Sequence, residues 1–492
     1  MDKPAELLAR DGEWSALAGF LEHPDPHLRL GVVSGRRRVG KSYLLRALCR
    51  AVGGLYVTAV AEEAAPAARR RFAAAVAGYA GISADLIGPA TSWESLLDTA
   101  VRQVVGRTGT GGLLVIDELP YWMAHSPELP GLLQLLYDRS RAGEGPPGGR
   151  IILCGSAMSV MNELLSGTKA LRGRATLDLG LPPFDLPTTA RHWGVEDPAA
   201  ALRLHAMLGG SPGYRDLSSV PAPRNLADFD AWVTGTVLDP RQALYSRSET
   251  EYLLREDPRF TGSTLHYAIL GAVAAGATSP ARIGALLERD RTALTRPIEA
   301  LASAGYLRYE SDPLWERRPV VTLADPIVRF HNLITLGQFD LVEAGRSDAA
   351  WRAAQPTFGS RIIGPHFEQC ARDWLRHHLV ALGDQRTGQV AATVVNDRHG
   401  RARHEVDVLG LRRGSGRAEI TWLGEAKATI TRRGLADIDR LDQVRGLLGE
   451  QGHDISGTRL VVFATEGFTS DLREAARRRD DLLLVDLADM AA

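Results

Sequence analysis

The chain has 492 residues, too long for one hydrophobic core, and its 45% apolar and 24% charged residues are typical of a globular protein with several domains. Its 58 Lys and Arg balance 59 Asp and Glu, which excludes a protein that binds nucleic acid as a general polycation. Cys49, Cys154 and Cys370 are far apart in the sequence, which excludes a disulfide framework and a cysteine-based zinc site.

Residues 28–180 alternate between strand patterns and helical patterns. Apolar runs at 28–35, 54–60, 111–119 and 150–157 have the length and composition of buried strands. Longer segments with helical spacing follow them. Repeated strand–helix alternation predicts an α/β fold with a doubly wound parallel sheet, in which ligands bind at the carboxyl ends of the strands.

The first of these strands leads into a glycine-rich loop that matches G-x-x-x-x-G-K-[ST] and opens a helix. Backbone N–H groups of such a P-loop surround phosphates, and the helix N-terminus adds partial positive charge. Lys41 is expected to reach the β- and γ-phosphates of ATP, and the Ser42 hydroxyl is expected to bind Mg²⁺. The predicted nucleotide contacts are Gly35, Arg36, Arg37, Arg38, Val39, Gly40, Lys41, Ser42 and Tyr43.

Two later strands end in polar residues that suit the same site. Asp117 ends the strand LLVID, where its carboxylate can bind Mg²⁺ through water, and Glu118 can polarise the attacking water. Ser156 follows the next strand and can sense the γ-phosphate. Arg174 is a candidate arginine finger, although a surface pair with Arg172 explains both residues equally well.

The strings SGRRRVGKSYLL, LLVIDELPYW, ILCGSAMSVM, LRGRAT and GGSPGY resemble the archaeal-type P-loop ATPases, which are related to AAA+ and STAND proteins. The similarity covers residues 5–340. It implies a helical lid after the core, with Gly210 and Pro212 near the nucleotide. It also implies that ATP works a conformational switch, often in oligomers. The start, ARDGEW, departs from the usual family pattern at the adenine side.

Residues 262–322 have the order helix, helix, helix, two-stranded wing, which is typical of a winged helix-turn-helix. Five arginines fall where phosphate contacts are expected: Arg289, Arg291, Arg296, Arg317 and Arg318. Four acidic residues offset them: Asp290, Glu299, Glu310 and Asp312. DNA contact and internal packing are therefore equally good interpretations of this segment.

The last part of the chain has strands carrying HEVDVLG and ITWLGEAK, after a helix containing HFEQ. Strand alternation puts Glu425 and Lys427 on one face, and Asp407 on a neighbouring strand can join them. With Glu368 from the helix, this set resembles the PD-(D/E)xK nuclease fold, which binds Mg²⁺ through its carboxylates and uses the lysine on water. The alternative is an ordinary ion pair between Glu425 and Lys427.

We expect a P-loop core at 1–186, a lid at 187–258, a winged helix at 259–340, a linker at 341–363 and a restriction-endonuclease-like domain at 364–492. ATP and Mg²⁺ are the expected cofactors, with DNA and a second copy of the chain as expected partners. The alternative is a regulatory ATPase that binds DNA or protein without cleavage, and a kinase ranks last because no acceptor motif follows the P-loop. Because no signal-peptide core or long apolar run occurs, we expect a cytoplasmic protein without membrane contact.

Overall fold

The computed structural model describes residues 1–83, 87, 92–109, 111–146, 148–167, 169–257, 259–260, 262–315, 319–397, 400–413 and 417–492. Arg317 and Arg318 of the predicted wing lie outside the described residues, as does the side chain of Glu310. In the part of the chain that is described, no helix is both long and apolar enough to cross a membrane.

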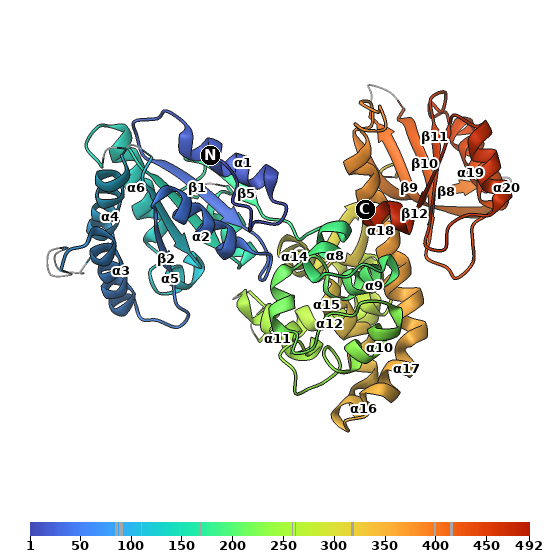
Figure 1. Cartoon of the computed structure of the whole chain (residues 1–492), viewed down its shortest axis with the longest axis horizontal. Helices are drawn as coiled ribbons and strands as arrows, with labels where there is room; N and C mark the ends of the chain where they lie inside the picture. The colour runs from blue at the N-terminus through green and yellow to red at the C-terminus, as the bar shows by residue number, and fades with distance from the viewer. Residues whose placement is uncertain are drawn as a thin grey trace.

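The first body of the molecule is a five-stranded sheet between helices, coloured blue to teal in Figure 1. The strands have the order β2-β3-β4-β1-β5, and all neighbouring pairs are parallel, which confirms the predicted α/β core. Their bounds are β1 Arg29–Ser34, β2 Leu55–Thr58, β3 Leu113–Asp117, β4 Arg150–Gly155 and β5 Ala175–Gly180. The helices are α1 Asp11–Glu22, α2 Lys41–Val52, α3 Ala65–Ala80, α4 Trp93–Thr108, α5 Leu119–His125, α6 Leu129–Arg141 and α7 Met158–Leu164.

Alternating side chains of these strands enter two separate cores. Val33, Val115 and Ile152 pack with α1 and α2, whereas Val32 and Ile116 pack with α3, α4 and α6. Burial of apolar residues on both faces explains why the strands are continuous hydrophobic runs. Because all five strands are parallel, their carboxyl ends lie at one edge of the sheet, where the loops carry the polar residues.

Helices form the middle of the molecule. They are α8 Leu186–Trp193, α9 Pro198–Leu208, α10 Leu226–Thr234, α11 Ser246–Glu256, α12 Thr264–Ala274, α13 Pro280–Leu287 and α14 Arg291–Ser303. An antiparallel pair follows, β6 Leu307–Ser311 and β7 Pro319–Leu323, so the predicted order of three helices and two strands is present. The helices α15 Pro326–Phe330, α16 Phe339–Glu343 and α17 Ser347–Thr357 complete this part.

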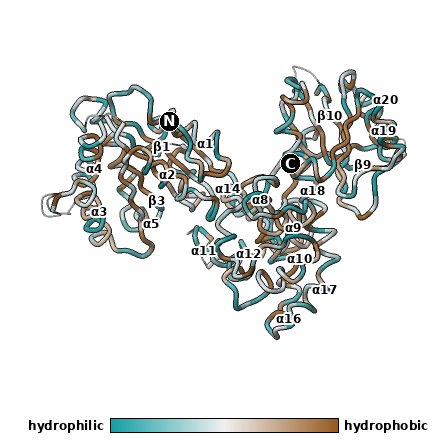
Figure 2. The backbone as a smooth tube through the Cα atoms, viewed as in Figure 1, coloured by the Kyte–Doolittle hydropathy of each residue, from teal (hydrophilic) through white to brown (hydrophobic). Residues whose placement is uncertain are grey.

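The segment expected as a linker, 341–363, is largely helical and packs internally. Trp351 of α17 is 2% exposed, and its ring lies 5.0 Å from that of Phe358. One hydrophobic core runs from Leu186 to Met490, so the middle helices and the last domain share buried contacts. Figure 2 shows hydrophobic residues gathered on the strands of both sheets and on central helices such as α9.

A second five-stranded sheet, orange to red in Figure 1, lies at the other end of the molecule. Its order is β12-β11-β10-β9-β8, with β8, β9 and β10 antiparallel and β10, β11 and β12 parallel. The strands are β8 Gln389–Asp397, β9 Ala402–Arg412, β10 Glu419–Lys427, β11 Arg459–Ala464 and β12 Leu482–Asp486. The helices are α18 Gly364–His378, α19 Leu435–Glu450, α20 Ser470–Arg478 and α21 Leu487–Ala491.

Candidate nucleotide site and candidate metal site

The P-loop connects β1 to α2 at the edge where the parallel strands end. Gly40, the residue before α2, has φ 96°, a conformation that favours glycine. The Lys41 side chain is buried, and its Nζ donates to the carbonyl oxygens of Gly35 at 2.7 Å and Arg36 at 3.1 Å. The ammonium therefore lies inside the loop that would surround the phosphates.

Two predicted magnesium ligands, Ser42 at the start of α2 and Asp117 at the end of β3, lie together. Ser42 Oγ donates to Asp117 Oδ2 at 2.6 Å, and Asp117 is 1% exposed. Tyr56 of the edge strand β2 also donates to Asp117 Oδ2, a contact that nothing in the local sequence pattern indicated. Hydroxyl and carboxylate oxygens are the donors that Mg²⁺ prefers, so this set fits the cation that accompanies ATP.

Glu118 and Ser156 complete the group of polar residues at this edge. Ser156 Oγ donates to Glu118 Oε2 at 2.8 Å, and the Ser156 backbone N–H donates to the same oxygen at 3.3 Å. Burial raises the pKa of Glu118, and the Lys41 ammonium partly opposes this rise. Lys41, Asp117, Glu118 and Ser156 are thus assembled by the strand order β3-β4-β1.

The three consecutive arginines of the P-loop contact carboxylates from distant segments. Arg36 pairs with Asp325, which precedes α15, Arg37 Nη1 lies 2.6 Å from Glu256 Oε1, and Arg38 makes two contacts with Glu249 at 2.6 and 2.8 Å. Their partners are 211 to 289 residues away in sequence. The middle helices therefore close over the P-loop through three ion pairs.

The segment between α9 and α10, which contains the predicted nucleotide contacts Gly210 and Pro212, also meets the P-loop. The Gly213 N–H donates to the Arg38 carbonyl at 3.0 Å, and Pro212 approaches Gly40. Gly210 accepts from the Phe184 N–H at 2.7 Å, and a Cβ at Gly210 would lie 1.8 Å from the Phe184 oxygen. A side chain at position 210 would force this contact apart.

Arg10 is a further P-loop contact that sequence reasoning missed. Its guanidinium lies 4.6 Å from the centre of the Phe184 ring, and Nη2 donates to the Val39 carbonyl at 3.0 Å. Burial lowers the pKa of Arg10, and its ion pair with Glu13 opposes that effect. The ARDGEW segment, whose departure from the family pattern left the adenine side open, thus supplies a buried cation against the loop.

Two other predicted nucleotide residues lie away from these contacts. Arg174 donates twice to Asp138 of α6, at 2.9 Å each, and Arg172 donates to the Gly167 carbonyl at 2.7 Å. Tyr43 is 53% exposed on α2. The candidate arginine finger is thus held by a carboxylate of its own domain.

The predicted C-terminal residues converge across β9, β10 and α18. Lys427 Nζ lies 2.9 Å from Asp407 Oδ2 and 2.8 Å from Glu425 Oε1, and both carboxylates are buried. The register that pairs Gly424 with Val408 brings these residues of neighbouring strands together. The Ala426 N–H also donates to Asp407 Oδ2 at 2.9 Å, which fixes that carboxylate.

Glu368 of α18 faces the same group. Burial, and then the charge of Asp407, raise the pKa of Glu368 to about 7. One turn later on α18, Arg372 donates to the Asp407 carbonyl at 2.7 Å. Asp407 and Glu425 thus share one ammonium, that of Lys427, and carboxylate oxygens are the ligands that a divalent cation such as Mg²⁺ prefers.

Arg440 of α19 belongs to this site although the sequence analysis did not select it. Its Nη1 pairs with Glu425, and its Nη2 donates to the Glu405 carbonyl at 2.6 Å. Gln443, also on α19, is exposed. Nothing in the local sequence distinguishes Arg440 from the other charged residues of the same helix, which are expected at the surface.

His366 lies in a hydrogen-bonded chain and not at the carboxylates. Arg329 Nη2 lies 3.3 Å from His366 Nδ1, His366 Nε2 lies 2.9 Å from His205 Nδ1, and His205 Nε2 lies 3.2 Å from the Phe184 oxygen. With Cys370, the histidines form a group of metal-ligating type within 4.8 Å. A metal cation bound to His366 Nε2 would leave the ring hydrogen on Nδ1, where it would meet the guanidinium of Arg329. The chain is thus satisfied by neutral histidines.

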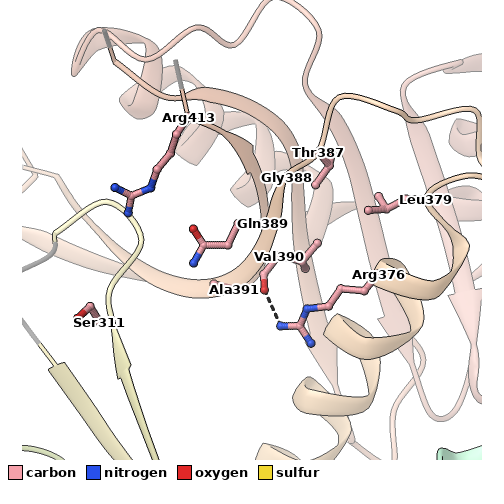
Figure 3. Close-up of a pocket in the computed structure, with 9 residues that line it drawn as sticks. All are labelled: Ser311, Arg376, Leu379, Thr387, Gly388, Gln389, Val390, Ala391 and Arg413. Atoms are coloured by element: carbon pink, nitrogen blue, oxygen red, sulfur yellow. Dashed lines mark hydrogen bonds between the residues drawn. The ribbon is translucent and has the colours of Figure 1, made fainter. Parts of the chain in front are cut away.

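A hollow of about 480 Å³ lies between the β6–β7 pair and the edge strand β8, outside both predicted sites. Figure 3 shows Arg376 and Arg413 on opposite sides of it, with Gln389 between them and Ser311 across from β8. Arg376 donates to the Val390 carbonyl, the contact drawn in Figure 3.

Three of the predicted basic residues lie on α14 or just before it and face solvent. Arg289, Arg291 and Arg296 are all exposed, and Asp290 caps the helix by accepting from the Thr292 N–H at 2.7 Å. One of the four acidic residues that offset these arginines therefore has a structural role.

Several solved structures align with parts of this chain. The Walker-type ATPase of Pyrococcus abyssi aligns at 21% identity over 66% of this chain and 96% of that chain, with a TM-score of 0.49. The Aeropyrum pernix ORC2 protein aligns at 15% identity over 72% of this chain and 97% of that chain, with a TM-score of 0.42. A STAND protein with a tetratricopeptide repeat sensor from Pyrococcus horikoshii aligns at 10% identity over 77% and 51%, with a TM-score of 0.31.

No protein-family model matches the chain, and no curated protein matches it. Three features of the molecule itself define the fold of its first 180 residues. These are the parallel strand order, the P-loop that opens α2, and the acidic end of β3. Residues 1–180 thus have the fold and the phosphate-binding motif of a P-loop nucleotide-binding domain.

Proposed function

We propose that the protein is an ATP-hydrolysing switch whose C-terminal domain is a metal-dependent nuclease acting on DNA. In this proposal residues 1–186 are the ATPase core, 187–258 the lid, 259–340 a winged helix and 364–492 the nuclease-like domain. The observation that supports it most is the position of the Lys427 ammonium between Asp407 and Glu425, with Glu368 near enough for the charge of Asp407 to raise its pKa.

At the ATP site, Lys41 would leave the two carbonyls that it now contacts and bind the β- and γ-phosphates. Ser42 and Asp117 would hold Mg²⁺, which neutralises charge on the phosphates. Glu118, whose pKa is raised by burial, is suited to accept a proton from the attacking water, and Ser156 orients it.

At the C-terminal site, Glu368, Asp407 and Glu425 would hold a divalent cation, which would polarise a phosphodiester. Burial alone would lower the pKa of Lys427, but the charges of Asp407 and Glu425 raise it. The ammonium therefore stays protonated at neutral pH. Lys427 would donate a hydrogen bond to the attacking water and orient it, which is electrostatic support and not base catalysis.

DNA is supported as the substrate by the basic side chains around this domain. Arg376 lies on the same helix as Glu368 and lines the hollow shown in Figure 3, with Arg413 on its other side. The exposed arginines of α14 would add phosphate contacts from the winged helix. Self-association through Arg174 as an arginine finger is a further part of the proposal and requires the pair with Asp138 to open.

The alternative is a regulatory ATPase whose C-terminal domain binds DNA or protein without cleavage. One observation favours this alternative: Glu425 is already paired with two cationic side chains, Lys427 and Arg440. A carboxylate neutralised in this way has less charge to offer a metal.

Plasmid cleavage separates the two functions. Wild type is expected to cut DNA with Mg²⁺ or Mn²⁺, and Glu425→Ala is expected to lose at least about 100-fold because the cation loses a ligand. Glu419→Ala is the matched control, since Glu419 lies on the same strand and pairs only with Arg386 and Arg412 among the described contacts. Each reaction is run with and without ATP. Intact ATP hydrolysis with no cutting by wild type under any condition would establish the alternative.

A further inference from the structure

The last residue of α11, Glu256, places a carboxylate at the polar edge of the ATPase sheet. Glu256 Oε1 lies 2.5 Å from Ser156 Oγ and 2.6 Å from Arg37 Nη1, and its side chain is 7% exposed. Ser156 also contacts Glu118 at 2.8 Å. One hydroxyl carries one hydrogen, so Ser156 can donate to only one of these two carboxylates at a time.

The position of Ser156 identifies which phosphate this carboxylate would meet. Strand β4 lies between β1, which leads into the P-loop, and β3, which ends at Asp117. A group at the end of β4 therefore lies between the phosphate-binding loop and the water-activating carboxylate. In a P-loop site that is where the terminal phosphate of a nucleoside triphosphate lies.

The space at this point is filled when Glu256 is in place. Only about 10 Å³ remains among Arg36, Arg37, Ser156, Leu253, Glu256 and Tyr306, about the volume needed for one water molecule. A phosphate group beside Ser156 would meet the negative charge of the Glu256 carboxylate.

We propose that Glu256 occupies the γ-phosphate position, so that ATP must displace it whereas ADP leaves it in place. This inference rests on the proposed nucleotide site and names the residue that makes the site discriminate between the two nucleotides. Displacement exchanges one anion for another, because Arg37 and Ser156 release the carboxylate and contact the γ-phosphate.

The displacement would also carry the nucleotide state into the lid. Glu256 ends α11, and Glu249, two turns earlier on the same helix, holds Arg38 by two contacts. Releasing Glu256 while Glu249 stays bound moves the end of α11 relative to its start. ADP-bound and nucleotide-free protein keep both contacts.

Isothermal titration with Mg²⁺ and either ADP or the β,γ-imido analogue of ATP tests the proposal. Glu256→Gln keeps the shape and removes the charge, so it is expected to tighten binding of the imido analogue about 10-fold and of ADP less than about 2-fold. Glu249→Gln is the matched control, because it removes a P-loop ion pair without touching Ser156. It is expected to shift both affinities by the same factor.

A second variant, together with thermal unfolding of each variant, distinguishes a folding defect from the effect of removing the Glu256 charge. Glu256→Asp keeps the charge but withdraws it by one methylene, and is expected to give an intermediate ratio of the two affinities. An unchanged ratio in Glu256→Gln would overturn the role of Glu256 while leaving the nucleotide site intact. If wild type binds neither nucleotide, the proposed ATP site fails and the role of Glu256 fails with it.

Discussion

Replacing Lys41 by alanine is expected to reduce ATP hydrolysis by at least about 100-fold, because no other ammonium reaches the predicted phosphate position among the described contacts. The lysine is buried inside the P-loop, with carbonyl oxygens as its present partners. In the ATP complex its charge would act on the β- and γ-phosphates in a site shielded from water, where a cation is worth far more than at the surface. Phosphate release at saturating Mg²⁺ and ATP measures the effect.

Lys169→Ala is the control for this experiment. Lys169 lies in the same domain, and its ammonium pairs with Glu163 at the surface. Its loss is expected to leave hydrolysis and stability almost unchanged. Full activity in Lys41→Ala, with a normal unfolding transition, would place ATP turnover at another site and remove the ATPase from the proposed function.

Replacing Glu368 by glutamine is expected to stabilise the metal-free protein at pH 8 by up to about 3 kcal/mol. The folded pKa of about 7 lies some 2.5 units above the ordinary value of about 4.5, and each unit corresponds to about 1.4 kcal/mol. The folded protein therefore binds more protons than the unfolded chain between about pH 4.5 and 7, and its stability falls as the pH rises through that range. At pH 4 the carboxyl is protonated in both states, so the advantage of glutamine is expected to vanish.

Urea unfolding in the presence of a chelator, at pH 4 and at pH 8, measures this difference. Glu405→Gln is the control, since Glu405 is an exposed carboxylate on β9 close to the same site. It is expected to change stability little at either pH. An equal or smaller stability of Glu368→Gln at pH 8 would mean that Glu368 is already well paired, and would weaken its assignment as a metal ligand.

Much of the fold was accessible from local sequence patterns. The strands of the first sheet are continuous apolar runs because both faces are covered, and the P-loop is a contiguous motif between a strand and a helix. The C-terminal residues were found for a similar reason. Strand alternation puts Glu425 and Lys427 on one face, and the antiparallel pairing of β9 with β10 brings Asp407 beside them.

The contacts of the arginines could not be predicted in this way. The sequence shows three basic residues in the P-loop, but their partners Asp325, Glu256 and Glu249 lie far downstream and stand in segments with no distinguishing pattern. Any of the 59 acidic residues satisfies the chemistry of an ion pair. Only the packing of the middle helices on the sheet selects these three.

The same holds for Arg440 at Glu425, Tyr56 at Asp117 and the histidine chain. By itself the sequence determined the strand and helix types, the P-loop and the sets of catalytic candidates, because each depends on spacing within a short segment. The tertiary structure alone decided that the Glu256 carboxylate of α11 stands beside Ser156 and that Arg174 is held by Asp138. These pairs join residues that come together when the hydrophobic cores are buried. Hydrophobic burial is non-directional, so the local sequence does not indicate which residues it will bring into contact.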